Sequence, residues 1–355
     1  MGAVGGHFSR SRNVSVDLST HYLGLRLKNP IVVAPCPLTR SMASLERLQT
    51  AGAGAVVLQS LFAEQIEHDE LESLRVHAYA GESYVESPSY VPGLNEYNFG
   101  PETHLEFLHD VKRQLSIPVI VSLNGTTAGK WIQYARLFQL AGADALEINL
   151  YSVPTDPEVT ARDVEDNYVA VVSEIAKQVT IPFAVKIAPF FSALPNFAAR
   201  LVAAGASGLV LFNRYLEPEL DLESLRVQPH LALSHNHEHR LVLRWIGILR
   251  DQLTCSLAAT SGIHSADEAL KSLLAGANVT MLASVLLQRG PETIANILEN
   301  MEKWLVTHQA KSLEQIIGTV SRNKSADSIA FERANYIKAL VAFTKTTHYC
   351  QSEND

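Results

Sequence analysis

One short phrase recurs four times along the chain and limits the folds open to it. Each copy contains Ala-Gly-Ala, follows an amphipathic helical pattern and leads into a run of apolar residues. A glycine at this point suits the left-handed turn that ends a helix, and small alanines allow close packing before a buried strand. The copies span 51–58, 141–148, 204–211 and 275–282. The phrase therefore predicts four units in which a helix leads directly into a strand.

Four further apolar runs lie between these copies and complete a set of eight predicted strands. Proline precedes two of them, at Pro118 and Pro182, and proline is tolerated at the start of a strand but not in its middle. The four runs are 31–34, 119–123, 183–187 and 256–259.

Helical patterns separate the predicted strands. They cover 103–114, 128–140, 164–178, 196–203, 240–253, 266–274 and 291–306. Strict alternation of apolar strands with helices indicates an α/β protein with a parallel sheet covered by helices. Eight such units favour closure into a (β/α)₈ TIM barrel over an open, doubly wound sheet.

The domain organisation follows from where this alternation begins, ends and is interrupted. We expect a flexible leader at 1–15, the barrel at 16–310 and a C-terminal helical appendage at 311–355. A long insert at 60–116, rich in tyrosine, follows the second strand. Active sites of such barrels lie on the loops after the strands, so this insert is expected to be a lid or substrate wall. A decorative excursion or a dimer contact is the alternative.

Composition excludes several classes of function. The formal net charge is -8 and no run of Lys or Arg occurs, which argues against a nucleic-acid partner. The three cysteines lie far apart and offer neither a disulfide framework nor an iron–sulfur or zinc site. No stretch approaches the ~20 apolar residues of a membrane span, and the first residues lack the apolar core of a signal peptide. We therefore expect a cytoplasmic protein that binds no membrane.

Polar residues at the ends of the predicted strands mark a shared site. Asn124, Asn149, Lys186 and Asn213 all stand at or near such ends. A lysine inside an apolar strand is costly unless it is paired or meets an anionic ligand, which makes Lys186 the most informative residue. A buried carboxylate such as Glu147 is the alternative partner.

Small residues follow the seventh and eighth predicted strands. They are Thr260-Ser261-Gly262 and Ala283-Ser284. Backbone N–H groups at the start of short helices are what a phosphate cradle requires at this place in a barrel. An ordinary turn is the other interpretation of the first of these motifs.

Taken in order, these motifs resemble those of dihydroorotate dehydrogenases, over roughly residues 16–310. Each motif is loose, but their shared order in register with the barrel is specific. The matching segments are Asn29-Pro30-Ile31, Asn149-Leu150, Val185-Lys186-Ile187, Asn213, Thr260-Ser261-Gly262-Ile263 and Arg289-Gly290-Pro291.

The resemblance implies an FMN cofactor and a flavin-dependent oxidoreductase that acts on CH–CH bonds. The FMN phosphate would lie on Ser261-Gly262 and Ala283-Ser284, and Lys186 beside the N1/O2 edge of the flavin, where a cation stabilises the reduced ring. The other positions that would line the flavin are Ala34, Pro35, Gln59, Asn124 and Asn149. Asn213 would bind substrate.

Ser152 stands where the family carries its catalytic base, three residues after an asparagine. Serine is a poor base at its ordinary pKa, so this role rests on position alone. A loop hydroxyl that makes a local turn is the other interpretation.

The chain departs from the family mainly where substrate would bind. Gln59 replaces a lysine on the second strand, Val153-Pro154 replaces Pro-Asn after the base, and Arg214 replaces Ser or Thr after Asn213. The substrate therefore need not be dihydroorotate, and a small pyrimidine-like or anionic molecule is expected. The Arg214 guanidinium either binds a substrate carboxylate or pairs at the surface with Glu217 or Glu219.

Four histidines lie close together before the helix at 240–253. They are His230, His235, His237 and His239. Alternating histidines in a strand share one face and suit zinc, but no distant third ligand is identifiable, so we expect no metal. The neighbouring Ser234 is a candidate for the phosphate end of the site.

Three functions remain open. The first is the FMN-dependent transfer of a hydride between a small substrate and flavin N5. The second is a lyase or isomerase that acts on a phosphorylated ligand through Lys186 as an amine nucleophile. The third is a non-catalytic flavoprotein accessory subunit. Because iron–sulfur cysteines and a nicotinamide-binding glycine motif are absent, the electron acceptor must be a small molecule or a redox partner protein. A homodimer is one expected assembly.

Overall fold

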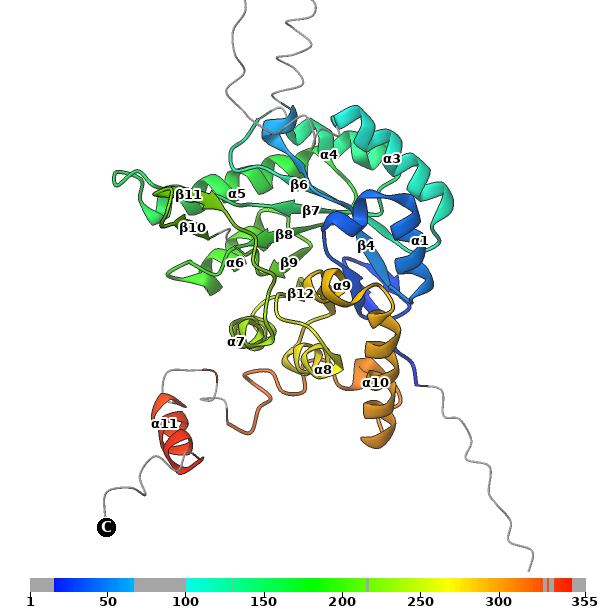
Figure 1. Cartoon of the computed structure of the whole chain (residues 1–355), viewed down its shortest axis with the longest axis vertical. Coiled ribbons are helices and arrows are strands. Elements are labelled where there is room, and N and C mark those ends of the chain that lie inside the picture. The colour runs from blue at the N-terminus through cyan, green and yellow to red at the C-terminus, as the bar shows by residue number, and fades with distance from the viewer. Residues whose placement is uncertain are drawn as a thin grey trace, which may run out of the picture.

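The computed structural model describes residues 16–66, 100–129, 131–214, 217–327, 331 and 335–346. Eight parallel strands stand side by side in the order β4-β3-β13-β12-β9-β8-β7-β6, and β4 also pairs with β6, which closes the barrel (Figure 1). Their bounds are Ile31–Val33 (β3), Ala55–Val57 (β4), Val119–Asn124 (β6), Ala145–Asn149 (β7), Phe183–Ile187 (β8), Gly208–Leu211 (β9), Ser256–Thr260 (β12) and Val279–Leu282 (β13). All eight predicted strands are present, and the predicted (β/α)₈ TIM barrel is confirmed.

Helices surround the barrel, and each predicted helical pattern corresponds to one of them. They are Pro101–Gln114 (α3), Trp131–Leu140 (α4), Ala161–Gln178 (α5), Leu194–Ala203 (α6), His239–Leu249 (α7), Ala266–Ala275 (α8) and Thr293–Thr307 (α10). The structure adds α1 (Met42–Thr50) and the short α9 (Ser284–Arg289). Each packs an apolar face on the strands, as Val171, Val172 and Ile175 do on α5.

The four Ala-Gly-Ala phrases lie where helices end. Gly52, Gly142, Gly205 and Gly276 follow α1, α4, α6 and α8, with φ angles of +108°, +98°, +119° and +127°. L-residues with a side chain rarely adopt such angles, so the predicted role of these glycines is confirmed.

Side chains alternate between the interior of the barrel and the layer under the helices. On β7, Ala145 belongs to the interior cluster, whereas Leu146 and Ile148 pack with the helices. Glu147 and Asn149, two and four residues after Ala145, therefore face the interior as well. The polar strand-end residues thus gather inside one barrel.

A hairpin that the sequence did not predict covers the amino-terminal end of the barrel. Its strands are β1 (Thr20–Tyr22) and β2 (Leu25–Leu27). The Leu23 N–H donates to Ser256 Oγ at 3.0 Å, at the first residue of β12. The Tyr22 side chain is fully buried in the interior cluster. This end of the barrel is therefore closed, so a ligand must enter from the opposite end.

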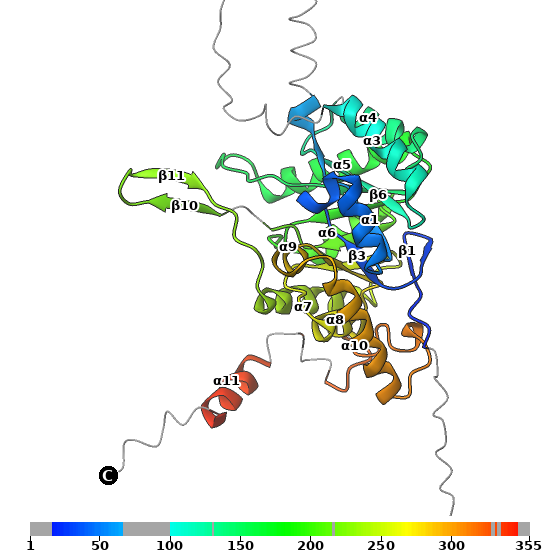
Figure 2. The same ribbon diagram turned by 45° about the vertical axis from the view of Figure 1, so that its right-hand side comes forward.

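A second unpredicted hairpin follows β9. Its strands β10 (Pro218–Asp221) and β11 (Arg226–Pro229) pair antiparallel and project from the barrel on the side opposite β1 (Figure 2). After β11 the chain turns through a short 3₁₀ helix, Asn236–Glu238, into α7.

Several predicted segments fall partly outside the described residues. The leader 1–15 does so entirely, and so does 67–99 of the insert, with its tyrosines. The described part of the insert contains the two-residue strand β5 (Leu61–Phe62), which pairs with β6, and α3. Towards the C-terminus, α11 (Asn335–Thr346) lies apart from the barrel helices in Figures 1 and 2. None of the described helices is long and apolar enough to cross a membrane.

Two of the phrase glycines allow a test of what this turn requires. A Cβ at residue 142 would meet only Lys112 Cγ, at 3.8 Å, whereas a Cβ at residue 205 would lie 2.6 Å from Ala176 Cβ. We expect Gly142→Ala to lower the free energy of unfolding by about 1–2 kcal/mol through backbone strain alone. Gly205→Ala should lower it by about 2 kcal/mol more because of crowding. Urea unfolding of both variants measures the difference, and equal losses would contradict the crowding argument.

Candidate active site

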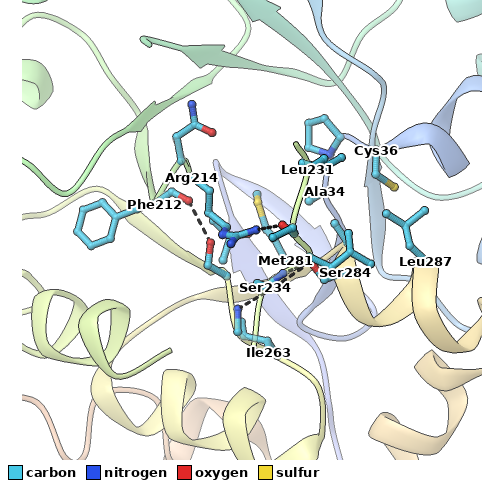
Figure 3. A pocket seen from close by; sticks show the side chains of 18 of the residues that line it. Ala34, Cys36, Phe212, Arg214, Leu231, Ser234, Ile263, Met281, Ser284 and Leu287 are labelled. Atoms are coloured by element: carbon cyan, nitrogen blue, oxygen red, sulfur yellow. Dashed lines mark hydrogen bonds between the residues drawn. The ribbon is translucent and has the colours of Figure 1, made fainter. Parts of the chain in front are cut away.

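A cavity of about 210 Å³, partly open to solvent, lies at the carboxyl-terminal end of the barrel (Figure 3). The structure brings together there Ser234, Thr260 and Ile263 with nine further residues that were named from the sequence. They are Ala34, Pro35, Lys186, Asn213, Arg214, Ser261, Gly262, Ala283 and Ser284.

Three polar residues form a row across neighbouring strands inside the barrel. Asn124 on β6 is in register with Asn149 on β7, and Asn149 is in register with Lys186 on β8. Asn213 Nδ2 donates to Asn149 Oδ1 at 3.0 Å, which links the row to the cavity. Asn124 and Asn149 are buried and do not themselves line the cavity.

Lys186 has a buried carboxylate partner. Its Nζ lies 3.6 Å from Glu147 Oε1, and the two side chains are 12% and 1% exposed. Burial raises the pKa of Glu147, and the charge of Lys186 opposes that rise. Neither carboxylate oxygen has a hydrogen-bond partner among the described residues. Lys186 is therefore paired with Glu147 and also lines the cavity, while its contact with an anionic ligand stays a prediction.

Backbone and hydroxyl groups form a cradle at the other side of the cavity. The Ser234 N–H donates to Ser284 Oγ at 3.0 Å, Ser234 Oγ donates to the same atom at 2.9 Å, and the Gly262 N–H donates to Ser234 Oγ at 3.3 Å (Figure 3). Three separate loops thus direct small polar groups at one place, as binding of a phosphate requires.

Glycine is required at position 262. Its φ is +70°, and a Cβ there would lie 2.6 Å from the His239 nitrogen and 2.7 Å from the His235 carbonyl oxygen. The loop after β12 can approach the start of α7 this closely only without a side chain.

Arg214 extends into the cavity, but its partner differs from those considered from sequence. Its Nε lies 2.8 Å from Glu238 Oε2, and its Nη1 donates to the Ala232 carbonyl oxygen at 2.6 Å (Figure 3). The expected surface partners, Glu217 and Glu219, are therefore wrong. The physical reason is the β10–β11 hairpin, after which the chain returns to the cavity and places Glu238 beside the guanidinium.

Ser152 lies on the loop after β7, and it does not line the cavity. Its Oγ is 2.5 Å from the phenolic oxygen of Tyr168 on α5. The Tyr168 side chain is buried, and burial raises the pKa of its phenol while hydrogen bonds with Ser152 lower it. Tyr168 was not predicted from the sequence; the available signal was a tyrosine on the apolar face of α5.

Gln59 does not line the main cavity. It lines a smaller pocket with Thr39, Arg40 and Phe107, and its carbonyl oxygen accepts from His104 Nε2 at 3.3 Å. Two residues of α3, His104 and Phe107, line this smaller pocket with it. The structure therefore does not bring Gln59 together with Lys186.

Cys36 lines the cavity directly after Ala34-Pro35, and the sequence analysis considered it only as a potential disulfide or metal residue. The thiol is buried, and burial raises its pKa. Met281 and Leu287 complete the apolar part of the wall (Figure 3).

The histidines before α7 do not form an alternating strand. His235 and His237 stack with ring centroids 5.8 Å apart at the 3₁₀ turn. His239 begins α7 and is buried, and burial lowers its pKa to about 4. Within the described ranges no three His, Cys, Asp or Glu side chains gather as a metal site.

Comparison with known proteins identifies the family to which the chain belongs. The family model described as dihydroorotate dehydrogenase matches residues 17–305. The putative dihydroorotate dehydrogenase A (fumarate) of Aeropyrum pernix is 25% identical over 320 residues, which cover 86% of this chain and 98% of that protein. The catalytic subunit of dihydroorotate dehydrogenase B (NAD(+)) is 24% identical in Thermoplasma acidophilum, over 86% of this chain and 99% of the relative. The Pyrococcus abyssi protein of the same description is 26% identical, with 85% and 98% covered. The resemblance inferred from the motifs is confirmed, and the chain belongs to the dihydroorotate dehydrogenase family.

Proposed function

We propose that the chain is an FMN-dependent oxidoreductase of the dihydroorotate dehydrogenase type, which transfers a hydride between a small substrate and flavin N5. Membership of the family supports the class of reaction, oxidation or reduction of a CH–CH bond. The observation that carries the cofactor is the cradle of Ser234, Gly262 and Ser284 at one side of the cavity that Lys186 also lines.

The cavity fits FMN in three respects. The cradle offers N–H and hydroxyl groups to a phosphate, and the lack of a side chain at Gly262 lets the loop after β12 lie close to the start of α7. Apolar groups such as Met281 suit a flat ring, and the Lys186 ammonium offers a cation to it. When bound, FMN would supply the hydride acceptor and donor.

The residue roles form part of the proposal. Ser261-Gly262 and Ala283-Ser284 would hold the phosphate, and Lys186 would stabilise negative charge on the reduced ring. The remaining proposed contacts of the ring are Ala34, Pro35, Asn124 and Asn149. Gln59 joins them on its strand position alone, and Ser152 would exchange the substrate proton.

We propose a small pyrimidine-like or anionic substrate. Asn213 and Arg214 line the cavity together and offer an amide and a guanidinium. A substrate carboxylate would compete with Glu238 for the guanidinium, since Glu238 holds Arg214 at 2.8 Å. Arg214 would thus favour acidic substrates over neutral ones.

The electron acceptor is proposed to be a small molecule or a redox partner protein. The relatives differ here, because one is described with fumarate and others as NAD(+)-type catalytic subunits. The proposal also includes a cytoplasmic location and a homodimer. It divides the chain into a leader at 1–15, a barrel at 16–310 and an appendage at 311–355.

The Glu147 pair favours this function over a lyase or isomerase that uses Lys186 as an amine nucleophile. An ion pair requires the charged amine, whereas formation of a Schiff base requires the neutral one. An accessory role without catalysis would leave the cradle intact, and it predicts bound FMN that no substrate reduces.

The cradle can be tested with FMN and riboflavin, which differ by the phosphate. We expect the wild type to bind FMN and turn yellow, and Ser284→Ala to weaken FMN binding about tenfold through loss of a hydrogen bond to a charged group. Riboflavin binding should stay unchanged in S284A. Flavin fluorescence titration measures both affinities.

Ser116→Ala is the matched control, because Ser116 is exposed and lines no part of the cavity. An equal loss of FMN and riboflavin affinity in S284A would contradict the phosphate assignment. A wild-type protein that binds no FMN would refute the proposed function as a whole.

The charge of Lys186 can be tested separately from its effect on stability. Lys186→Met leaves Glu147 buried without its partner and should lower the free energy of unfolding by on the order of 3 kcal/mol. It should also lower the reduction potential of bound FMN by on the order of 30 mV. The double variant Lys186→Met with Glu147→Gln removes the unpaired charge, so stability should recover while the potential stays low. Recovery of both would show that Lys186 acts only through folding.

A further inference from the structure

The inference concerns Tyr168, a residue to which the proposed function gives no role. Its phenolic oxygen lies 2.5 Å from Ser152 Oγ, a short hydrogen bond between two hydroxyl groups. Ser152 is the residue proposed to exchange the substrate proton, and nothing in the sequence explained how a serine could do so.

The ring of Tyr168 is held firmly. It lies edge-on to Phe191, with centroids 6.3 Å apart at 65°, and 6.2 Å from Phe197 on α6. Phe191 and Phe197 stack on each other at 4.3 Å. Packing of this kind leaves the ring few orientations, so the hydroxyl stays directed at the loop after β7.

The phenol is a neutral group at physiological pH. Burial raises its pKa, hydrogen bonds with Ser152 oppose that rise, and no charged group contributes within the described residues. The charged residues nearby on α5 and α6 bond to one another, Arg200 to Glu165 and Asp166. Tyr168 therefore keeps its proton and can donate it in a hydrogen bond.

We propose that Tyr168 is a positioning residue for Ser152: its phenol fixes the serine hydroxyl and donates a hydrogen bond to Oγ whenever that oxygen has lost its proton. Either oxygen can donate while both are protonated, but only the phenol has a hydrogen to give to an alkoxide. Such a bond stabilises the anionic form of Ser152 and makes it available as a base.

This inference rests on the role of Ser152 in the proposed function, and it states where the substrate proton goes. In the oxidative direction the substrate C–H bond breaks and its proton forms an O–H bond with Ser152 Oγ. The electron pair of that C–H bond forms the C=C bond, and the hydride would pass to the flavin from the neighbouring carbon with the electron pair of its own C–H bond. Tyr168 keeps its own proton throughout, and the partly exposed Ser152 releases its hydroxyl proton to solvent before it takes the substrate proton.

The test replaces the serine by a residue whose ionisation can be measured directly. In the full-length Ser152→Cys variant, the pH dependence of alkylation by iodoacetamide gives the pKa of the thiol at position 152. Mass spectrometry of the peptide that carries this position separates it from the native cysteines. We expect the thiol of S152C to titrate about one pH unit lower than that of S152C combined with Tyr168→Phe, because the phenol donates to the thiolate. S152C combined with Tyr134→Phe, which removes a half-buried hydroxyl on α4, should titrate like S152C alone.

A second measurement covers the case in which S152C packs poorly. With tyrosines labelled at Cζ, ¹³C NMR follows the phenol of Tyr168, whose pKa should rise in Ser152→Ala because the hydrogen bond with the serine side chain, which lowers it, is lost. Equal thiol pKa values with and without the phenol, or an unchanged Tyr168 titration in S152A, would overturn the inference. Neither experiment uses flavin or substrate, so its failure is distinguishable from failure of the proposed function.

Discussion

Side chains on a strand point alternately to its two sides, and in a barrel closed by the pairing of β4 with β6 one of those sides is a single interior. The site depends on this constraint. The parallel register places Asn124, Asn149 and Lys186 side by side at one end. The β1–β2 hairpin and Tyr22 fill the other end, so the polar row meets ligands only at the carboxyl-terminal side.

The interior row is organised around a charge that is only partly compensated inside the protein. Glu147 Oε1 lies 3.6 Å from Lys186 Nζ, which is too long for a strong hydrogen bond. Lys186 also lines the cavity. A cation placed in this way is oriented by its partner but can still act on an anionic group above it. The cradle of Ser234, Gly262 and Ser284 and the ammonium of Lys186 thus give the cavity two distinct places for negative charge.

The scaffold was predictable from sequence because its signals are local. A buried parallel strand is a continuous apolar run, and the glycine of each Ala-Gly-Ala phrase has the positive φ that ends the helix before it. The two hairpins were not predictable in the same way. Their strands have three or four residues, and β10–β11 is largely exposed, so no apolar period marks it.

The contacts of the site were less predictable than its residues. Lys186, Asn213 and the small residues after β12 and β13 were identified by strand order, which the fold preserves. The partners of Arg214 and Ser152 depend on how distant segments pack. Glu238 reaches Arg214 only because the chain returns from a hairpin, and Tyr168 reaches Ser152 only because α5 rests on the loop after β7. Strand order carries no information on such distances.

Closure of the barrel has a consequence for water. The pairing of β13 with β3 joins segments about 250 residues apart, Thr280 with Ile31. It is one of the strand pairings that close the barrel. In the unfolded chain water hydrates the charges of both Glu147 and Lys186. Closure of the barrel removes that hydration, which costs free energy. Burial of the surrounding apolar side chains must therefore supply the driving force for closure. Desolvation of these two side chains therefore costs free energy at the centre of the barrel, beside the cavity that Lys186 lines.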